Sequence, residues 1–319
     1  MAAETVRRRH RIRKTPWYTL EYVMFFLAAL MTILLALGGL VDLVGLIRGG
    51  RDTGAEKRTI TTTSKAEDQT EEPTEAPTEV DPLSVYAEDT GYGGTLYKMI
   101  QEHPEAAYVL RNLQLYPEEV LVFVTRFPEA MSFAAGYPDY MNTGIRPAYN
   151  IAGEVKKGEM PKLIQWDPRW GYYAYGEGMI GYSGCGPTCL SMVSIYYTGY
   201  HDNDPLAVAT YAAENGHYTK GSGSAWTLMT DACTNFGVTS KELPLDENKV
   251  IQAVEEGRPV ILAMGPGVFT DNGHFIIICG HDENGFIIRD PNSPTNTARR
   301  WAWSEIENQI RNLWVFDAA

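Results

Sequence analysis

Residues 181–197 read GYSGCGPTCLSMVSIYY, which places a cysteine in a glycine-rich turn in front of an apolar run. Leu190 and Val193 recur at helical spacing, and Pro187 suits the first turn of a helix, where its missing N–H does no harm. The stretch therefore predicts a helix that begins beside Cys185. A thiol there would lie over unpaired N–H groups and the positive end of the helix dipole, which favours the thiolate. A buried structural cysteine is the alternative interpretation of the same pattern.

His274 begins a second apolar run further downstream, and a third run returns to Asp290 after turn residues around Asp282. Two such runs joined by turn residues are typical of a β-hairpin. If the reversal centres on Asp282, His274 lies directly opposite Asp290, and directly opposite residues share a face. A carboxylate beside an imidazole fixes its tautomer and holds the ring ready to take a proton from a thiol. Asn292 has the same parity as Asp290 and is the alternative partner.

Gln165 lies upstream of the cysteine in the aromatic stretch LIQWDPRWG, residues 163–171. Its side-chain amide could pair with the backbone N–H of Cys185 to hold the oxyanion of a tetrahedral intermediate. No metal site or other cofactor is expected, because the sequence has no CxxC, HExxH or EF-hand spacing. His274 and His281 are seven residues apart, which would place them on opposite faces of one strand.

Residues 160–319 carry helical patterns first and strand patterns afterwards, an α+β order. The expected helices follow Cys185 and recur at 206–214, 225–236 and 247–256, and the expected strands cover 259–265, 274–280, 286–290 and 313–316. The chain has four cysteines, so at most one disulfide can form if Cys185 is a free nucleophile. Cys189 and Cys279 fit small core side chains.

The charge of the chain is divided unevenly along its length. The net charge is −13, but residues 1–51 carry eight Lys and Arg against three acids, which leaves −18 for the rest. An acidic chain without a basic stripe argues against a nucleic-acid partner.

The N-terminal residues predict a membrane anchor. Residues 1–16 form a basic tail, and residues 22–41 contain no charge, a length that spans a bilayer as a helix. The sequence therefore predicts a transmembrane signal anchor over residues 17–48. The basic cluster keeps the N-terminus cytosolic and places the C-terminal part outside the cell. A cleaved signal peptide is the alternative, although its apolar region should be shorter and end at a small-x-small site.

Two further regions precede residue 160. Residues 49–81 are rich in Thr, Glu and Pro without apolar periodicity, which predicts a disordered linker. Residues 82–150 repeat an aromatic-Pro-acid signature, and each copy predicts a helix start: His103-Pro104-Glu105, Tyr116-Pro117-Glu118, Phe127-Pro128-Glu129 and Tyr137-Pro138-Asp139. We expect a helical neck that packs on the C-terminal part, or alternatively a regulatory segment that covers a catalytic groove.

Four motifs together resemble a known family: residues 165–171, 183–189, 273–278 and 289–292. They are similar to papain-like cysteine peptidases related to the double-glycine peptidases that process bacteriocins, the peptidase C39-like group. The resemblance covers about residues 160–316. It implies a papain-like fold with Cys185 as nucleophile, His274 as base, Asp290 as orienting acid and Gln165 as oxyanion donor.

The sequence departs from that family in two respects. In papain-type enzymes the glutamine lies a few residues before the cysteine, whereas here the gap is twenty residues and Met179 occupies the nearer position. The transporter that carries the double-glycine peptidases is replaced by the single anchor, so leader-peptide processing is not implied.

The sequence predicts a membrane-anchored extracellular cysteine peptidase of the bacterial cell surface. It would hydrolyse peptide bonds of a peptide or protein substrate through an acyl-enzyme on Cys185. Two alternatives remain: a hydrolase or transpeptidase of peptidoglycan cross-bridges on the same fold, and a catalytically silent surface binding module.

Overall fold

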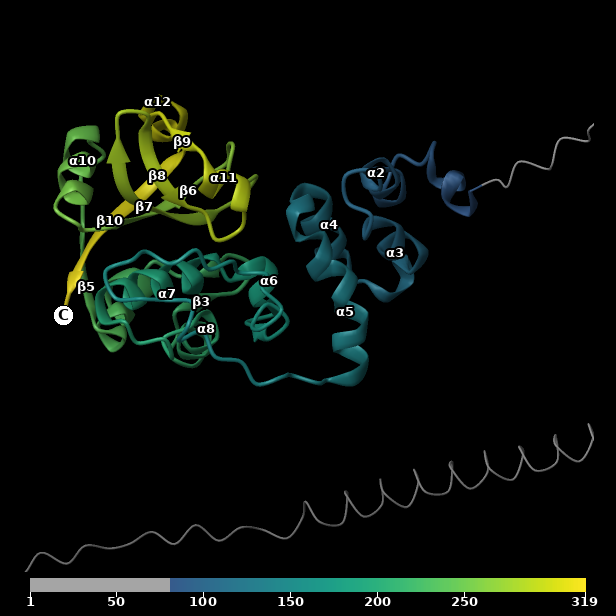
Figure 1. Ribbon diagram of the computed structural model, residues 1–319, viewed down its shortest axis with the longest axis horizontal. Helices are drawn as coiled ribbons and strands as arrows, with labels where there is room; N and C mark the ends of the chain where they lie inside the picture. The colour runs from purple at the N-terminus through teal and green to yellow at the C-terminus, as the bar shows by residue number, and fades with distance from the viewer. Residues whose placement is uncertain (1–80) are drawn as a thin grey trace, which may run out of the picture. The chain divides into compact units, whose positions relative to one another are not determined.

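The computed structural model describes residues 81–319 (Figure 1). The expected basic tail, the transmembrane anchor over 17–48 and all but the last residue of the linker therefore lie outside the described residues. No helix within residues 81–319 combines the length and the apolar character that a bilayer crossing requires.

The first described region is a set of short helices, residues 82–143, here called the helical segment. Three of the four proline signatures mark the start of a helical element, as the sequence predicts: α3 follows Pro104, α4 follows Pro117 and a 3₁₀ turn begins at Pro128. Its elements are η1 (Pro82–Tyr86), α2 (Tyr92–Met99), α3 (Ala106–Arg111), η2 (Leu113–Leu115), α4 (Glu118–Arg126), η3 (Pro128–Ala130) and α5 (Met131–Thr143).

The fourth proline signature was wrong as a helix start. Pro138 lies inside α5, which runs without interruption from Met131 to Thr143. A proline in a helix interior removes one backbone hydrogen bond and costs about 3 kcal/mol. Tyr137 and Tyr140 on either side of it are both buried in the core of the helical segment. Burial of these aromatic rings offsets the loss, so tertiary packing overrides the local signal.

The C-terminal part is built on one antiparallel sheet of six strands in the order β5-β10-β6-β7-β8-β9. Its central strand β6 is apolar throughout and every residue in it is buried, as a strand covered on both faces requires. The strands are β5 (Val238–Glu242), β6 (Val260–Met264), β7 (His274–Asp282), β8 (Gly285–Arg289), β9 (Arg300–Trp301) and β10 (Ile310–Ala318).

Helices cover both faces of this sheet. The central helix α7 (Cys185–Thr198) is buried from Gly186 to Ile195 and packs in one core with Ile261 and Ile277. Figure 1 places α8 (Pro205–Glu214) beside α7 on that face. On the other face α10 (Glu247–Glu255) packs against Leu262 and Ile276. The remaining helical elements are α6 (Ile180–Ser183), α9 (Thr227–Thr230), η4 (Ala232–Phe236), α11 (Pro294–Ala298), α12 (Trp303–Ile306) and η5 (Glu307–Gln309).

This order of elements confirms the mixed helix-and-sheet expectation. The helices and strands expected after Cys185 are present with ends that differ by a few residues, except that the helix expected over 225–236 is divided into α9 and the 3₁₀ turn η4. The sequence reading missed the edge strands β5 and β9 and the two-residue pairs β1 (Ala174–Tyr175) with β2 (Gly178–Met179) and β3 (Tyr218–Thr219) with β4 (Gly223–Ser224). In β5 only Val238 is buried, so its pattern carries no apolar alternation.

The helical segment packs on the C-terminal part through Tyr172. This ring stacks on Phe133 with 4.5 Å between centroids and lies 4.4 Å from the ring of Tyr140. Its hydroxyl donates a 2.8 Å hydrogen bond to the carbonyl oxygen of Phe133. Met179, the residue at the papain-like glutamine position, is buried in the same cluster. It therefore belongs to the packing of the helical segment.

Candidate active site

Cys185 is the first residue of α7, as the sequence predicts. Gly184 lies between α6 and α7, as the C-cap of the first helix and the N-cap of the second. A Cβ at Gly184 would lie 2.5 Å from the side chain of Ile180, and one at Gly186 would lie 2.4 Å from the Ser224 hydroxyl. Both glycines are thus required by packing around the thiol, and the Cys185 side chain itself is half-buried.

His274 begins β7, and its register with β8 differs from the expected one. The hairpin reverses between Glu283 and Asn284, because Asp282 pairs with Gly285. Extension of the pairing of Ile277 with Arg289 places His274 opposite residue 292, so the expectation that it lies directly opposite Asp290 was wrong.

A β-bulge nevertheless brings His274 and Asp290 to the same face. Near the turn Gly280 pairs with Ile287, whereas Ile278 pairs with Ile288, so Cys279 is the extra residue. If the pairing at the turn continued without a bulge, His274 would lie opposite residue 293, and Asp290 would lie on the opposite face. The bulge shifts the pairing by one residue, so that His274 and Asp290 lie on the same face of the sheet.

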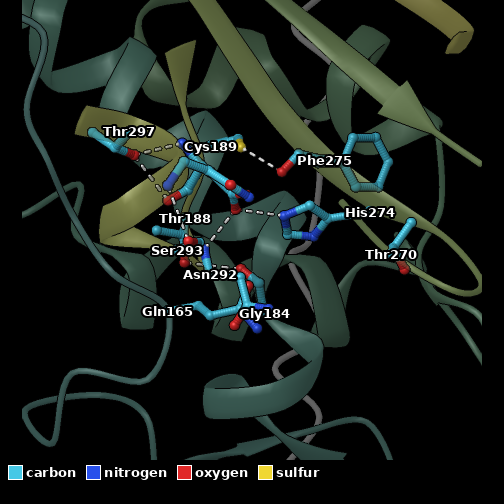
Figure 2. Close-up of polar contacts among 12 residues, drawn as sticks. Gln165, Gly184, Thr188, Cys189, Thr270, His274, Phe275, Asn292, Ser293 and Thr297 are labelled. Atoms are coloured by element: carbon cyan, nitrogen blue, oxygen red, sulfur yellow. Dashed lines mark hydrogen bonds and ion pairs between the residues drawn. The ribbon is translucent and has the colours of Figure 1, made fainter. Parts of the chain in front are cut away.

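The two side chains meet in a buried hydrogen bond (Figure 2). His274 Nε2 lies 2.7 Å from Asp290 Oδ1, and the two side chains are 6% and 1% exposed. Because Nε2 is engaged by Asp290, the second ring nitrogen, Nδ1, is the one available to interact with Cys185. The carboxylate of Asp290 also accepts from the backbone N–H of Asn292 at 2.9 Å and from the side-chain amide of Asn296 at 2.8 Å. These bonds fix the carboxylate that faces the imidazole.

The surroundings of His274 favour its charged form. Burial alone would lower the pKa of the imidazole. The charge and hydrogen bond of Asp290 act in the opposite direction, as does Cys185, and together they raise the pKa of His274 to about 10. An imidazolium at neutral pH beside a thiol at a helix start is the arrangement that stabilises a thiolate.

Asn292 does not replace Asp290 at the histidine. Its backbone carbonyl accepts the indole N–H of Trp166 at 2.9 Å, and its N–H is directed to the carboxylate of Asp290. Asn292 therefore anchors the turn after β8, whereas Asp290 contacts His274.

Gln165 is brought next to Cys185 despite the twenty-residue gap. Its backbone N–H donates to Pro291 O at 2.8 Å, beside the Asp290 turn, and its side-chain Nε2 donates to Gly181 O at 3.1 Å. The intervening chain folds through the β1–β2 pair and α6 before it returns to the cysteine. The side chain is 2% exposed and lines the same hollow as Cys185 and His274, with one amide N–H left over.

Two connected hollows flank the cysteine and histidine. The larger, of about 1050 Å³, is bounded by the loop 221–224, Trp226 and Arg311. The smaller, of about 450 Å³, lies on the Gln165 side. It is walled by residues of α4 and the chain just after it: Glu118, Glu119, Val122, Phe123, Arg126 and Phe127. The sequence offered a segment that covers the groove as one alternative for residues 82–150, but no local pattern identified which of its residues would line a hollow.

Sequence reasoning also missed Asn296, which holds the second oxygen of Asp290. The polar residues that follow β8 have a pattern typical of a turn, and nothing in that pattern indicates a contact with Asp290. All four cysteines are free thiols, and Cys189 is fully buried in the core around α7.

Comparison with known proteins places the C-terminal part in a family. Residues 159–315, about half of the chain, match the model of the Peptidase C39-like family. This region is a peptidase C39-like domain. The resemblance seen in the four sequence motifs is thereby confirmed for the C39-like domain.

Solved structures of the same kind are similar to the chain. The peptidase domain of Streptococcus ComA, a bifunctional ABC transporter involved in a quorum-sensing pathway, is 18% identical, with a TM-score of 0.35; the match covers 43% of this chain and 91% of that one. A protein described as a C39-like peptidase from Bacillus anthracis is 14% identical, with a TM-score of 0.30; that match covers 53% of this chain and 97% of the other. No curated protein matches the chain.

Proposed function

We propose that the chain is a cysteine peptidase that hydrolyses peptide bonds through Cys185, His274 and Asp290. The observation that carries this proposal is the buried 2.7 Å contact between His274 and Asp290 beside the cysteine that begins α7. A nucleophile at a helix start, a base and an orienting group are the three parts that thiol-dependent acyl transfer needs.

The proposed reaction begins with attack of the Cys185 thiolate on the substrate carbonyl carbon. The oxyanion that forms accepts hydrogen bonds from the backbone N–H of Cys185 and from the Gln165 amide N–H that Gly181 does not use. The imidazolium of His274 then gives its proton to the leaving amine as the C–N bond breaks, which leaves a thioester. His274 next takes a proton from water, the hydroxide attacks the thioester, and acid and thiolate are released.

Alkylation by iodoacetamide at pH 7 tests the nucleophile in the full-length chain. Cys279 is the internal control, because it is also half-buried and burial raises the pKa of its thiol. An ordinary thiol is only a few per cent ionised at this pH, so we expect Cys185 to react at least about tenfold faster than Cys279. His274→Ala should remove that advantage. Equal rates for Cys185 and Cys279 in the wild-type chain would contradict the proposal.

Hydrolysis is measured separately on a mixture of unfolded peptides, with cleavage products identified by mass spectrometry. Cleavage by the wild-type chain and its loss in Cys185→Ala are expected. Purified peptidoglycan belongs in the same assay, because release of cross-bridge peptides would assign the substrate to the cell wall. A folded chain with fast Cys185 alkylation but no cleavage of either material would favour a binding module.

We also propose, from the sequence alone, that residues 17–48 anchor the chain in the cell membrane with the C39-like domain outside. The support is the uncharged stretch preceded by the basic cluster. A protease added to intact cells should remove the C39-like domain and leave residues 1–16 protected. Protection of the domain until the cells are lysed would refute the orientation.

A further inference from the structure

Glu129 connects the helical segment to the turn that carries Asp290. It lies in η3, between α4 and α5, and its carboxylate reaches the start of α11. It accepts hydrogen bonds from the backbone N–H of Thr295 at 2.9 Å, from the hydroxyl of Thr295 at 2.6 Å and from the hydroxyl of Ser293. Three donors at one helix start therefore converge on a single carboxylate from a distant part of the chain.

From this point hydrogen bonds continue to the candidate base. The hydroxyl of Ser293 caps α11 by accepting the backbone N–H of Asn296 at 3.1 Å. The side chain of Asn296 donates to Asp290 Oδ2 at 2.8 Å, and Asp290 Oδ1 is the partner of His274. Figure 2 shows Ser293, Thr297 and His274 grouped around this path. Each member is joined to the next by a hydrogen bond.

Apolar packing does little to place α11. The helix has five residues, and none of them is buried. Its other ties to the domain are polar: the indole N–H of Trp301 donates to Asn296 O at 2.9 Å, and the hydroxyl of Thr297 bonds the backbone of Asp290. Because no side chain of this short helix is fully buried, polar contacts carry much of its restraint, and the three bonds of Glu129 are a large share of them.

We propose that Glu129 is a positioning residue for the Asp290–His274 pair, acting through the start of α11 and Asn296. The inference rests on the proposed function, because it assigns Glu129 to the orientation of the same base. If Glu129 has this role, the helical segment helps to orient the catalytic groups and is not a cover that can be removed from the groove without effect.

Three substitutions in the full-length chain test the role of Glu129. Glu129→Ala removes all three hydrogen bonds. Glu129→Gln keeps an oxygen for Thr295 and offers an N–H to the hydroxyl of Ser293, so it should restore the contact. Glu102→Ala is the matched control, an exposed acid of the same segment that makes no side-chain hydrogen bond within the described residues.

Two readouts are measured for each variant. The first is the rate of Cys185 alkylation by iodoacetamide from pH 5 to pH 10. The second is the pKa of His274 from NMR titration of its ring protons, which needs no peptidase activity. The titratable groups that act on His274 are Asp290 and Cys185, so a displaced Asp290 should lower the pKa of the imidazole.

We expect Glu129→Ala to slow Cys185 alkylation at pH 7 about threefold to tenfold and to move the onset of alkylation to higher pH, because a less stable imidazolium makes the thiol harder to ionise. Glu129→Gln and Glu102→Ala should behave like the wild-type chain. Asn296→Ala should reproduce the effect, and the double variant should be no slower than either single one, because both break the same path.

The inference would be overturned if Glu129→Ala left both the pKa of His274 and the alkylation profile of Cys185 unchanged from the wild-type chain. Additive effects of Glu129→Ala and Asn296→Ala would also overturn it. Slowing accompanied by alkylation of the buried Cys189 and Cys233 would also overturn it, because general loosening of the fold would then be the cause. Slow Cys185 alkylation in the wild-type chain itself would refute the proposed function, whereas the NMR titration would still decide the role of Glu129.

Discussion

At the scale of single residues, the protonation of His274 ties the site to the stability of the fold. The ordinary pKa of this group is 6.5, and burial, which lowers it, is outweighed by Asp290 and Cys185, which raise it to about 10. A group whose pKa is higher in the folded state than in the unfolded state stabilises the fold, and this stabilisation is complete at pH values below the unfolded pKa. That contribution is lost as the pH rises through the folded value, here between about 6.5 and about 10.

Asp290→Asn should therefore flatten the pH dependence of stability. The amide keeps an oxygen for the backbone N–H of Asn292 but carries no charge to hold the imidazolium. We expect the difference in free energy of unfolding between wild type and variant to be largest near pH 6.5 and to shrink towards pH 10. Urea unfolding of the full-length chain at several pH values measures this difference. A difference that stays constant across the range would show that Asp290 does not set the charge of His274.

At the scale of elements, α4 decides the electrostatics of the cleft on the Gln165 side. Most acids along the two hollows are engaged: Asp271 pairs with Arg126, Glu177 with Lys220, and Glu118 accepts the hydroxyl of Tyr92. Glu119 lines both hollows, and its side chain makes no hydrogen bond or ion pair within residues 81–319. This helix thus presents an unpaired carboxylate to a bound peptide on the Gln165 side, whereas Arg311 lines only the larger hollow.

Glu119→Gln should weaken a preference for basic side chains near the cleaved bond. Two exposed opposite charges attract by about 0.2–1 kcal/mol, so we expect enrichment of Lys and Arg among cleavage sites to fall by up to about fivefold. The measurement is the residue distribution around cleavage sites in a peptide mixture. Glu283→Gln, in the exposed β7–β8 turn, is the control for the charge change. Identical distributions for wild type and Glu119→Gln would exclude α4 as a source of specificity.

At the scale of the whole molecule, local patterns predicted the elements but not how distant ones meet. The helix start at Cys185 and the apolar runs of the β7–β8 hairpin are local signals, and both were correct. The bulge at Cys279 was not predictable, because a one-residue insertion leaves the apolar pattern almost unchanged. The contact of Glu129 with Ser293 joins residues 164 positions apart, and α4 lines the cleft beside residues as distant as His274, so no periodicity encodes such docking.

The same long-range contacts predict that the helical segment and the C39-like domain unfold together. Tyr172 belongs to the domain but is buried between Phe133 and Tyr140 of the segment, and its hydroxyl binds Phe133 O. Truncation of a buried aromatic side chain typically costs about 3–5 kcal/mol, whereas loss of one hydrogen bond costs about 1 kcal/mol.

We therefore expect Tyr172→Ala to lower the free energy of unfolding by about 3–5 kcal/mol and Tyr172→Phe by about 1 kcal/mol, within one cooperative urea transition of the described region. Tryptophan fluorescence follows the domain, and far-ultraviolet circular dichroism follows the helices of both parts. Coincident transitions that shift together in Tyr172→Ala would establish a single folding unit. Two separate transitions, with only the helical part shifted, would show that the domain folds without the segment and that Tyr172 merely docks it.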